Sequence, residues 1–121
     1  MREFDHIGLP TEVKRPDEMW VESTRVWVTS PTQNPDMIEY LRYESDSPIT
    51  GPLRTGPHVC FRVDDLDKEI EGENVILGPF APAENLRVVF IYKDGLVYEF
   101  MESKAGKDWH KGATEFIRWL I

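Results

Sequence analysis

The apolar residues of this chain occur in short runs that are rich in β-branched and aromatic side chains and that end at Gly, Pro or Asp. Runs of this kind are typical of strands rather than helices. The last two runs flank Asp94-Gly95, a dipeptide that favours a tight hairpin turn. The predicted strands are residues 4–9, 24–29, 37–43, 58–63, 75–77, 87–92 and 97–101.

Two helices are expected in addition to the strands. Residues 64–71 begin with acidic groups, which are favoured at a helix N-terminus. Residues 113–121 carry Phe116, Trp119 and Leu120 on one side at helical spacing. This C-terminal helix needs a surface to cover, either on its own chain or on another subunit. We therefore expect a homodimer.

The order of these elements indicates one unit that is used twice. Residues 3–44 and 57–102 both run from a first strand through a connector to closing strands, and residues 45–56 form a polar linker between them. The connector of the first unit is charged and carries Pro16 in its middle, so we expect a loop there instead of a helix. The predicted fold class is α+β, with both modules in a single domain of residues 1–121.

Length, charge and cysteine content narrow the classes of partner. A chain of 121 residues with 40% hydrophobic residues fits one folded domain. Its net charge of −8 argues against nucleic acids and anionic membranes as partners. Cys60 is the only cysteine, the N-terminus lacks the apolar run of a signal peptide, and no apolar stretch is long enough to span a bilayer. These features predict a cytoplasmic protein.

Four polar residues lie inside the predicted apolar strands, at equivalent places in the two modules. They are His6 and His58 in the first strands and Glu39 and Glu99 in the last strands. Because side chains alternate between the faces of a strand, each glutamate shares its face with apolar residues. A carboxylate on such a face needs a cation as partner. Two imidazoles and two carboxylates suit Zn, Mn, Co, Ni or Fe(II).

The residues alone leave a structural interpretation open. Each histidine could be a hydrogen-bonded strand residue with no ligand. Each glutamate could face solvent, since its neighbours, Ile38 with Tyr40 and Tyr98 with Phe100, would also form an apolar face. Spacing along the chain does not establish that four strands bring these side chains together.

Four segments resemble, in the same order, motifs of a known superfamily. They are Phe4-Asp5-His6-Ile7-Gly8-Leu9, Ile38-Glu39-Tyr40-Leu41 followed by Asp46-Ser47-Pro48-Ile49, Pro57-His58-Val59-Cys60-Phe61-Arg62-Val63-Asp64-Asp65, and Gly95-Leu96-Val97-Tyr98-Glu99-Phe100. Residues 3–102 as a whole resemble the vicinal oxygen chelate superfamily, the group of glyoxalase I, methylmalonyl-CoA epimerase and bleomycin-resistance proteins. The segment at 46–49 and the strand that follows it look most like methylmalonyl-CoA epimerases.

The resemblance implies two βαβββ modules, the first without its helix, whose mixed sheet curls around an open cleft with a divalent metal. His6, Glu39, His58 and Glu99 fall on the ligand positions of the family. Enzymes of this kind hold two adjacent oxygens of a small substrate on the metal, which stabilises an enolate while a carboxylate moves a proton. The implied function is a metal-dependent lyase, isomerase or epimerase, with Glu99 or Glu39 as the catalytic carboxylate.

Two other functions remain open at this point. The same fold could be a non-catalytic module that sequesters or senses a small molecule, which the shortened first module and the open cleft would suit. An extradiol-type dioxygenase would need Fe(II) held by His58, Glu99 and a further histidine, and the two carboxylates disfavour it. Coenzyme A thioesters are also disfavoured as substrates, because the acidic chain has no basic cluster to meet their phosphates.

Overall fold

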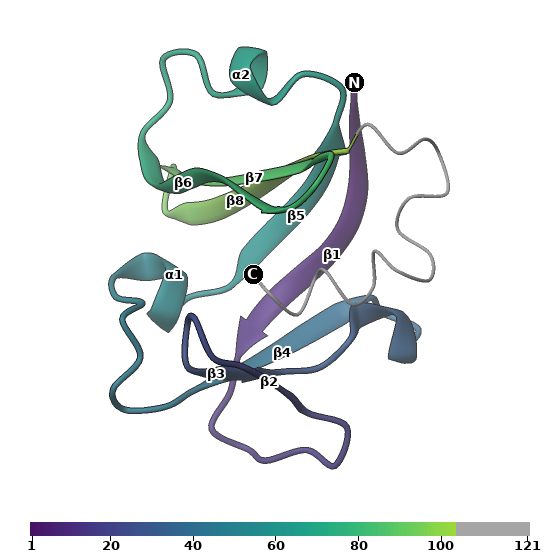
Figure 1. Ribbon diagram of the computed structural model, residues 1–121, viewed down its shortest axis with the longest axis vertical. Helices are drawn as coiled ribbons and strands as arrows, with labels where there is room; N and C mark the ends of the chain where they lie inside the picture. The colour runs from purple at the N-terminus through teal and green to yellow at the C-terminus, as the bar shows by residue number, and fades with distance from the viewer. Residues whose placement is uncertain (104–121) are drawn as a thin grey trace.

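The structure is a computed structural model that describes residues 1–103, and these residues form one mixed sheet of eight strands (Figure 1). The strands are β1 (Arg2–Pro10), β2 (Met19–Val21), β3 (Val26–Val28), β4 (Ile38–Tyr43), β5 (His58–Val63), β6 (Val75–Ala83), β7 (Leu86–Lys93) and β8 (Leu96–Ser103). The helical elements are short: η1 (Pro31–Gln33, a 3-10 turn), α1 (Pro52–Thr55) and α2 (Leu66–Glu69). The predicted α+β fold with a curled mixed sheet is confirmed. The helix predicted at 113–121 lies outside the described residues.

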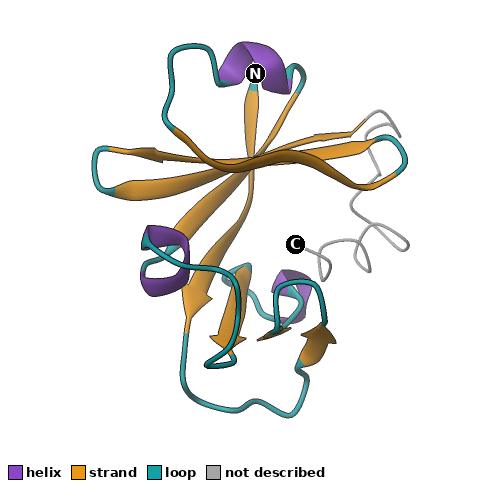
Figure 2. Ribbon diagram, turned by 60° about the vertical axis from the view of Figure 1, so that its left-hand side comes forward, coloured by secondary structure: helices purple, strands orange, loops and turns teal. Residues whose placement is uncertain are grey.

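The two halves of the sheet repeat one arrangement. The strand order is β2-β3-β4-β1-β5-β8-β7-β6. The first strand of each half pairs in parallel with the last strand of that half, β1 with β4 and β5 with β8. The two first strands, β1 and β5, pair antiparallel at the centre. In Figure 1 the strands β6 to β8 lie above and β2 to β4 below, with β1 running between them, and Figure 2 shows that the sheet is curled rather than flat.

The turn between β7 and β8 is the hairpin that the sequence predicts. Lys93 pairs with Leu96, and the two residues between them both have positive φ, 54° at Asp94 and 84° at Gly95. Positive φ at both central residues is what a tight hairpin turn with the right twist requires. The dipeptide therefore fixes the register of the strand that carries Glu99.

Four elements differ from the sequence-based expectation, and one of them is β6, which runs to Ala83 although a strand of residues 75–77 was expected. Residues 19–21, expected in a loop, form β2, because Trp20 pairs with Trp27 and their rings lie 4.9 Å apart. The predicted linker contains α1, which buries Leu53. The predicted helix at 64–71 is shorter, with the side chain of Asp65 accepting a hydrogen bond from the backbone N–H of Lys68.

The core divides between the two faces of the sheet. On β7, Val88 and Phe90 belong to a cluster on the inner face, whereas Val89 and Ile91 pack on the outer face with Leu66 of α2. Strands β7 and β8 therefore carry buried residues on both faces. No helix within residues 1–103 is long and apolar enough to cross a membrane.

Candidate metal centre

The four polar side chains singled out in the sequence come together on the inner face of the sheet. His6 lies on β1, Glu39 on β4, His58 on β5 and Glu99 on β8, and these four strands are adjacent in the order β4-β1-β5-β8. All four side chains are buried, at 5% exposure or less. The alternation argument therefore places them correctly, and the interpretation in which the two glutamates face solvent is wrong.

The ligand atoms of these residues converge on one point. The Nε2 atom of His6 lies 3.6 Å from Oε1 of Glu39 and 3.5 Å from Oε1 of Glu99. The Nε2 atom of His58 lies 3.9 Å and 3.2 Å from the same two oxygens. Ligand atoms of His6, Glu39 and His58 all lie within 4.8 Å of one another. One ion could touch donors from β1, β4 and β5, and Glu99 on β8 lies within 3.5 Å of both histidine nitrogens.

The hydrogen-bonding state of the two imidazoles fits a metal ion. Within the described residues, Nε2 of His6 and both ring nitrogens of His58 are buried without a hydrogen-bond partner. Buried polar atoms without a partner are costly and rare in native structures. The cavity between these side chains has a volume of about 10 Å³, which is room for one ion or one water molecule. Donor type, orphaned nitrogens and space all fit a divalent cation.

The charges at the site favour a cation. Burial raises the pKa of Glu99, but the nearby His58 and His6 outweigh it and leave that pKa lowered, so the carboxylate is ionised. Burial would lower the pKa of His6, but Cys60, Asp5 and Glu39 raise it well above its usual value. The raised pKa of His6 favours the protonated, positively charged form of its ring when no metal ion is bound. Protons and metal ions therefore compete for the same donors.

Asp5 holds the ring of His6 from behind. Its Oδ2 atom lies 2.7 Å from Nδ1 of His6, and Nε of Arg62 lies 3.4 Å from its Oδ1. In the neutral tautomer that carries its proton on Nδ1, the ring donates a hydrogen bond to Asp5. The Nε2 atom then carries a lone pair that faces the cavity. Neighbours along a regular strand face opposite sides, but β1 has a bulge between Phe4 and His6, and both Asp5 and His6 are buried. The bulge is why the sequence analysis missed Asp5.

Gly8 makes room for the ring of His58. The two residues are partners across the β1 and β5 pair. A Cβ atom at Gly8 would lie 1.9 Å from Cε1 of His58. On the other side the ring meets Phe90 edge to face, with the centroids 5.6 Å apart. The absence of a side chain at Gly8 is therefore what lets His58 lie flat over β1, a role that the sequence analysis did not assign.

The segment that links the two halves forms part of the cavity wall. Ile49 and Leu53 line the cavity together with Leu41, Tyr43 and Phe90. In Figure 1 the helix α1, which carries Leu53, lies between the upper and lower strands. These apolar side chains limit access of water to the four ligand atoms. The predicted linker is therefore part of the site.

Arg54 fixes this segment in place. Its guanidinium donates hydrogen bonds to the backbone carbonyls of Glu44, Ser47 and Ile49, over 3.0 to 3.3 Å. The hydroxyl of Ser47 donates to the carbonyl of Thr24, over 2.5 Å. The guanidinium of Arg54 is thus engaged by the backbone of its own segment.

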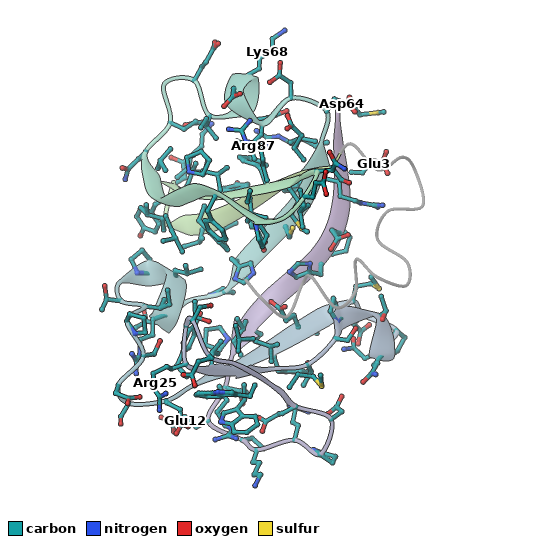
Figure 3. All side chains as sticks on the ribbon, in the orientation of Figure 1. Glu3, Glu12, Arg25, Asp64, Lys68 and Arg87 are labelled. Atoms are coloured by element: carbon teal, nitrogen blue, oxygen red, sulfur yellow. The ribbon has the colours of Figure 1, made fainter. Side chains whose placement is uncertain are left out.

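The charged side chains that Figure 3 labels lie toward the two ends of the molecule, away from its centre.

Comparison with known proteins supports the fold. No protein-family model and no curated protein sequence matches this chain. A hypothetical protein of Bacillus halodurans C-125 is 21% identical, with a TM-score of 0.63 over 88% of this chain and 97% of that one. A methylmalonyl-CoA epimerase from Mycobacterium tuberculosis is 17% identical, with a TM-score of 0.54 over 83% of this chain and 87% of that one. This chain shares their fold.

A third structure matches more loosely. It is a mutant of 4-hydroxymandelate synthase from Streptomyces coelicolor, 15% identical, with a TM-score of 0.48 over 88% of this chain and 49% of that one. The fold shared with the methylmalonyl-CoA epimerase is the fold that the sequence resemblance implies.

Proposed function

We propose that this protein is a divalent-metal-dependent enzyme of the glyoxalase type, a lyase, isomerase or epimerase that acts on a small molecule with two adjacent oxygens. The observation that carries the proposal is the convergence of two buried imidazoles and two buried carboxylates from four adjacent strands, with ring nitrogens that have no other partner in the described chain. The sequence resemblance and the fold shared with an epimerase support the same reaction class.

The four converging side chains are the proposed metal ligands. His6, Glu39, His58 and Glu99 would hold a Zn, Mn, Co, Ni or Fe ion. When bound, such an ion supplies a positive charge that polarises the substrate oxygens and stabilises negative charge that develops on them. Ile49, Leu53 and Phe90 shield the site from water, which strengthens every electrostatic interaction within it.

A carboxylate of the site is the proposed proton carrier. The Oε1 atom of Glu39 lies farther from the two histidines than Oε1 of Glu99 does, at 3.6 and 3.9 Å against 3.5 and 3.2 Å. These distances favour Glu39 as the base and Glu99 as the firmer ligand, although both carboxylates are within reach of a ligand in the cavity. Burial and the charges of Glu39 and Glu99 raise the pKa of Tyr43, so its hydroxyl stays protonated and can donate to a substrate oxygen.

Metal analysis tests the proposal directly. Tag-free protein is dialysed against a mild chelator, reloaded with single metals and measured by mass spectrometry. We expect close to one ion per chain in the wild type and a loss of about 100-fold in affinity in Glu99→Ala, by the share of the binding free energy that one ligand carries. The exposed Glu71→Ala serves as the control. Absence of metal in wild type would overturn the proposal and favour the non-catalytic binding module of the same fold.

Replacement of Asp5 by asparagine tests how the site is supported. Asn keeps the shape of Asp5 but offers His6 a neutral acceptor, so the ring is less basic and less firmly oriented. We expect metal affinity to fall by about 10- to 100-fold, the usual effect of losing such a partner. Competition with a chelating dye measures the change, and the exposed Asp64→Asn is the matched control. Equal affinity in Asp5→Asn and wild type would mean that Asp5 does not support His6.

A further inference from the structure

A groove of about 520 Å³ lies beside the metal cavity. Ile49 lines both the groove and the cavity, so its side chain belongs to the walls of both spaces. The groove volume falls in the range of small-molecule sites, whereas the cavity itself has room for one ion. Any substrate larger than its metal-binding oxygens must therefore extend out of the cavity.

Strand β6 supplies the apolar wall of the groove. Leu77 and Phe80 are three residues apart, so in a regular strand they would face opposite sides. The pairing of β6 with β7 shifts register between these two residues, and both side chains line the groove. They also pack against the inner core cluster that contains Phe90, a residue of the cavity wall. The groove and the cavity thus share one continuous apolar lining.

The groove lining offers few polar atoms. None of the side chains that line the groove carries a charge. Ser23 and Thr24 contribute hydroxyls, and the oxygen of Thr24 is shielded from solvent and has no hydrogen-bond partner within the described residues. Pro48 and Pro82, which lack a backbone N–H, also line the groove. The chemistry of this surface suits a largely apolar, uncharged group, and it does not suit phosphates or carboxylates.

We propose that the groove binds an alkyl or aryl substituent of the substrate, while the two adjacent oxygens of the same molecule enter the cavity past Ile49. This inference rests on the proposed function and narrows its substrate class to uncharged-tailed compounds. Leu77 and Phe80 set the preference for the tail.

Hydroxamates provide the test, because they offer two adjacent oxygens with a tail of any length. Acetohydroxamate and hexanohydroxamate are titrated by calorimetry into metal-loaded protein. A fully buried methylene strengthens binding about fourfold and a half-buried one about twofold. The four additional methylenes of the longer probe should therefore tighten binding at least about 16-fold. In Leu77→Thr the ratio of hexanohydroxamate affinity to acetohydroxamate affinity should fall several-fold. The affinity for acetohydroxamate, which has no long tail, should not change.

The controls separate this inference from the proposed function. Val75→Thr changes an exposed residue of β6 outside the groove lining and should keep the full gain. Equal binding of both hydroxamates, or a full gain in Leu77→Thr, would overturn the groove while leaving the metal site intact. No binding of either probe would overturn both. Tail-dependent binding that persists after exhaustive chelation would support the groove and contradict the metal site.

Discussion

Replacing both His6 and His58 with alanine is expected to remove metal binding almost completely. Structural zinc sites with four protein ligands have apparent binding free energies of roughly 10–16 kcal/mol, which gives a scale of about 3 kcal/mol per ligand. Loss of two ligands should therefore weaken binding by about 10⁴-fold. Wild-type protein should also unfold at a higher temperature when metal is added, since the ion binds only the folded state. The double variant should show no such shift.

A matched control is available on the same two strands. Ile7 and Val59 are paired across β1 and β5, and each follows its histidine in the sequence, so both point to the opposite face. The variant Ile7→Ala/Val59→Ala should keep its metal, whatever its loss of stability. Metal content and thermal shift are read on both variants. Unchanged metal content in His6→Ala/His58→Ala would refute the ligand assignment.

Replacement of Gly8 by alanine is expected to disrupt the site without changing any ligand. The new methyl group would lie 1.9 Å from Cε1 of His58, so either the ring must turn out of the cavity or β1 and β5 must separate. Overpacking of this kind costs about 1–3 kcal/mol in stability. Displacement of one ligand should lower metal affinity by about 100-fold, by the share of binding free energy that one ligand carries. Chelator competition measures the affinity and urea unfolding the stability.

Gly56→Ala is the corresponding control. Gly56 has an extended backbone with φ −120°, and a Cβ atom there would lie 3.3 Å from the carbonyl oxygen of Pro52. The carbonyl oxygen of Pro52 needs to move by only a few tenths of an ångström. The metal affinity of Gly56→Ala should therefore match that of the wild type. If Gly8→Ala bound metal as tightly as Gly56→Ala, the close approach of β1 would have no role in positioning His58.

The strand pattern was enough to single out the four residues that the structure brings together. Alternation places Glu39 with Leu41 and Glu99 with Val97 on one face, and that face is the buried one. Alternation also places Phe100 on the opposite face of β8 from Glu99, and there Phe100 packs on Leu66 of α2. What alternation alone did not provide was the adjacency of the strands. The family resemblance supplied that expectation, and the strand order confirms it.

Features that depend on pairing between distant strands were not readable from the sequence. The bulge that turns Asp5 inward exists only because β1 pairs with β5, and the register shifts that bring Leu77 and Phe80 together exist only because β6 pairs with β7. Strand β2 has only three residues, too few for a clear sequence pattern. Its assignment as a strand depends on its pairing with β3. The local sequence pattern predicts the alternation of side chains along a strand. It does not predict bulges or register shifts, which depend on the partner strand.

The spacing of the four proposed ligands along the chain has a consequence for how the ion would be acquired. Successive ligands are separated by 39 − 6 = 33, 58 − 39 = 19 and 99 − 58 = 41 positions, so no local segment resembles a chelating peptide. An unfolded or partly synthesised chain therefore has little affinity for the ion, and half of the donors are absent until β5 and β8 are in place. Metal loading would follow folding, and the ion that enters would be chosen by a finished cavity from those available in the surrounding solution.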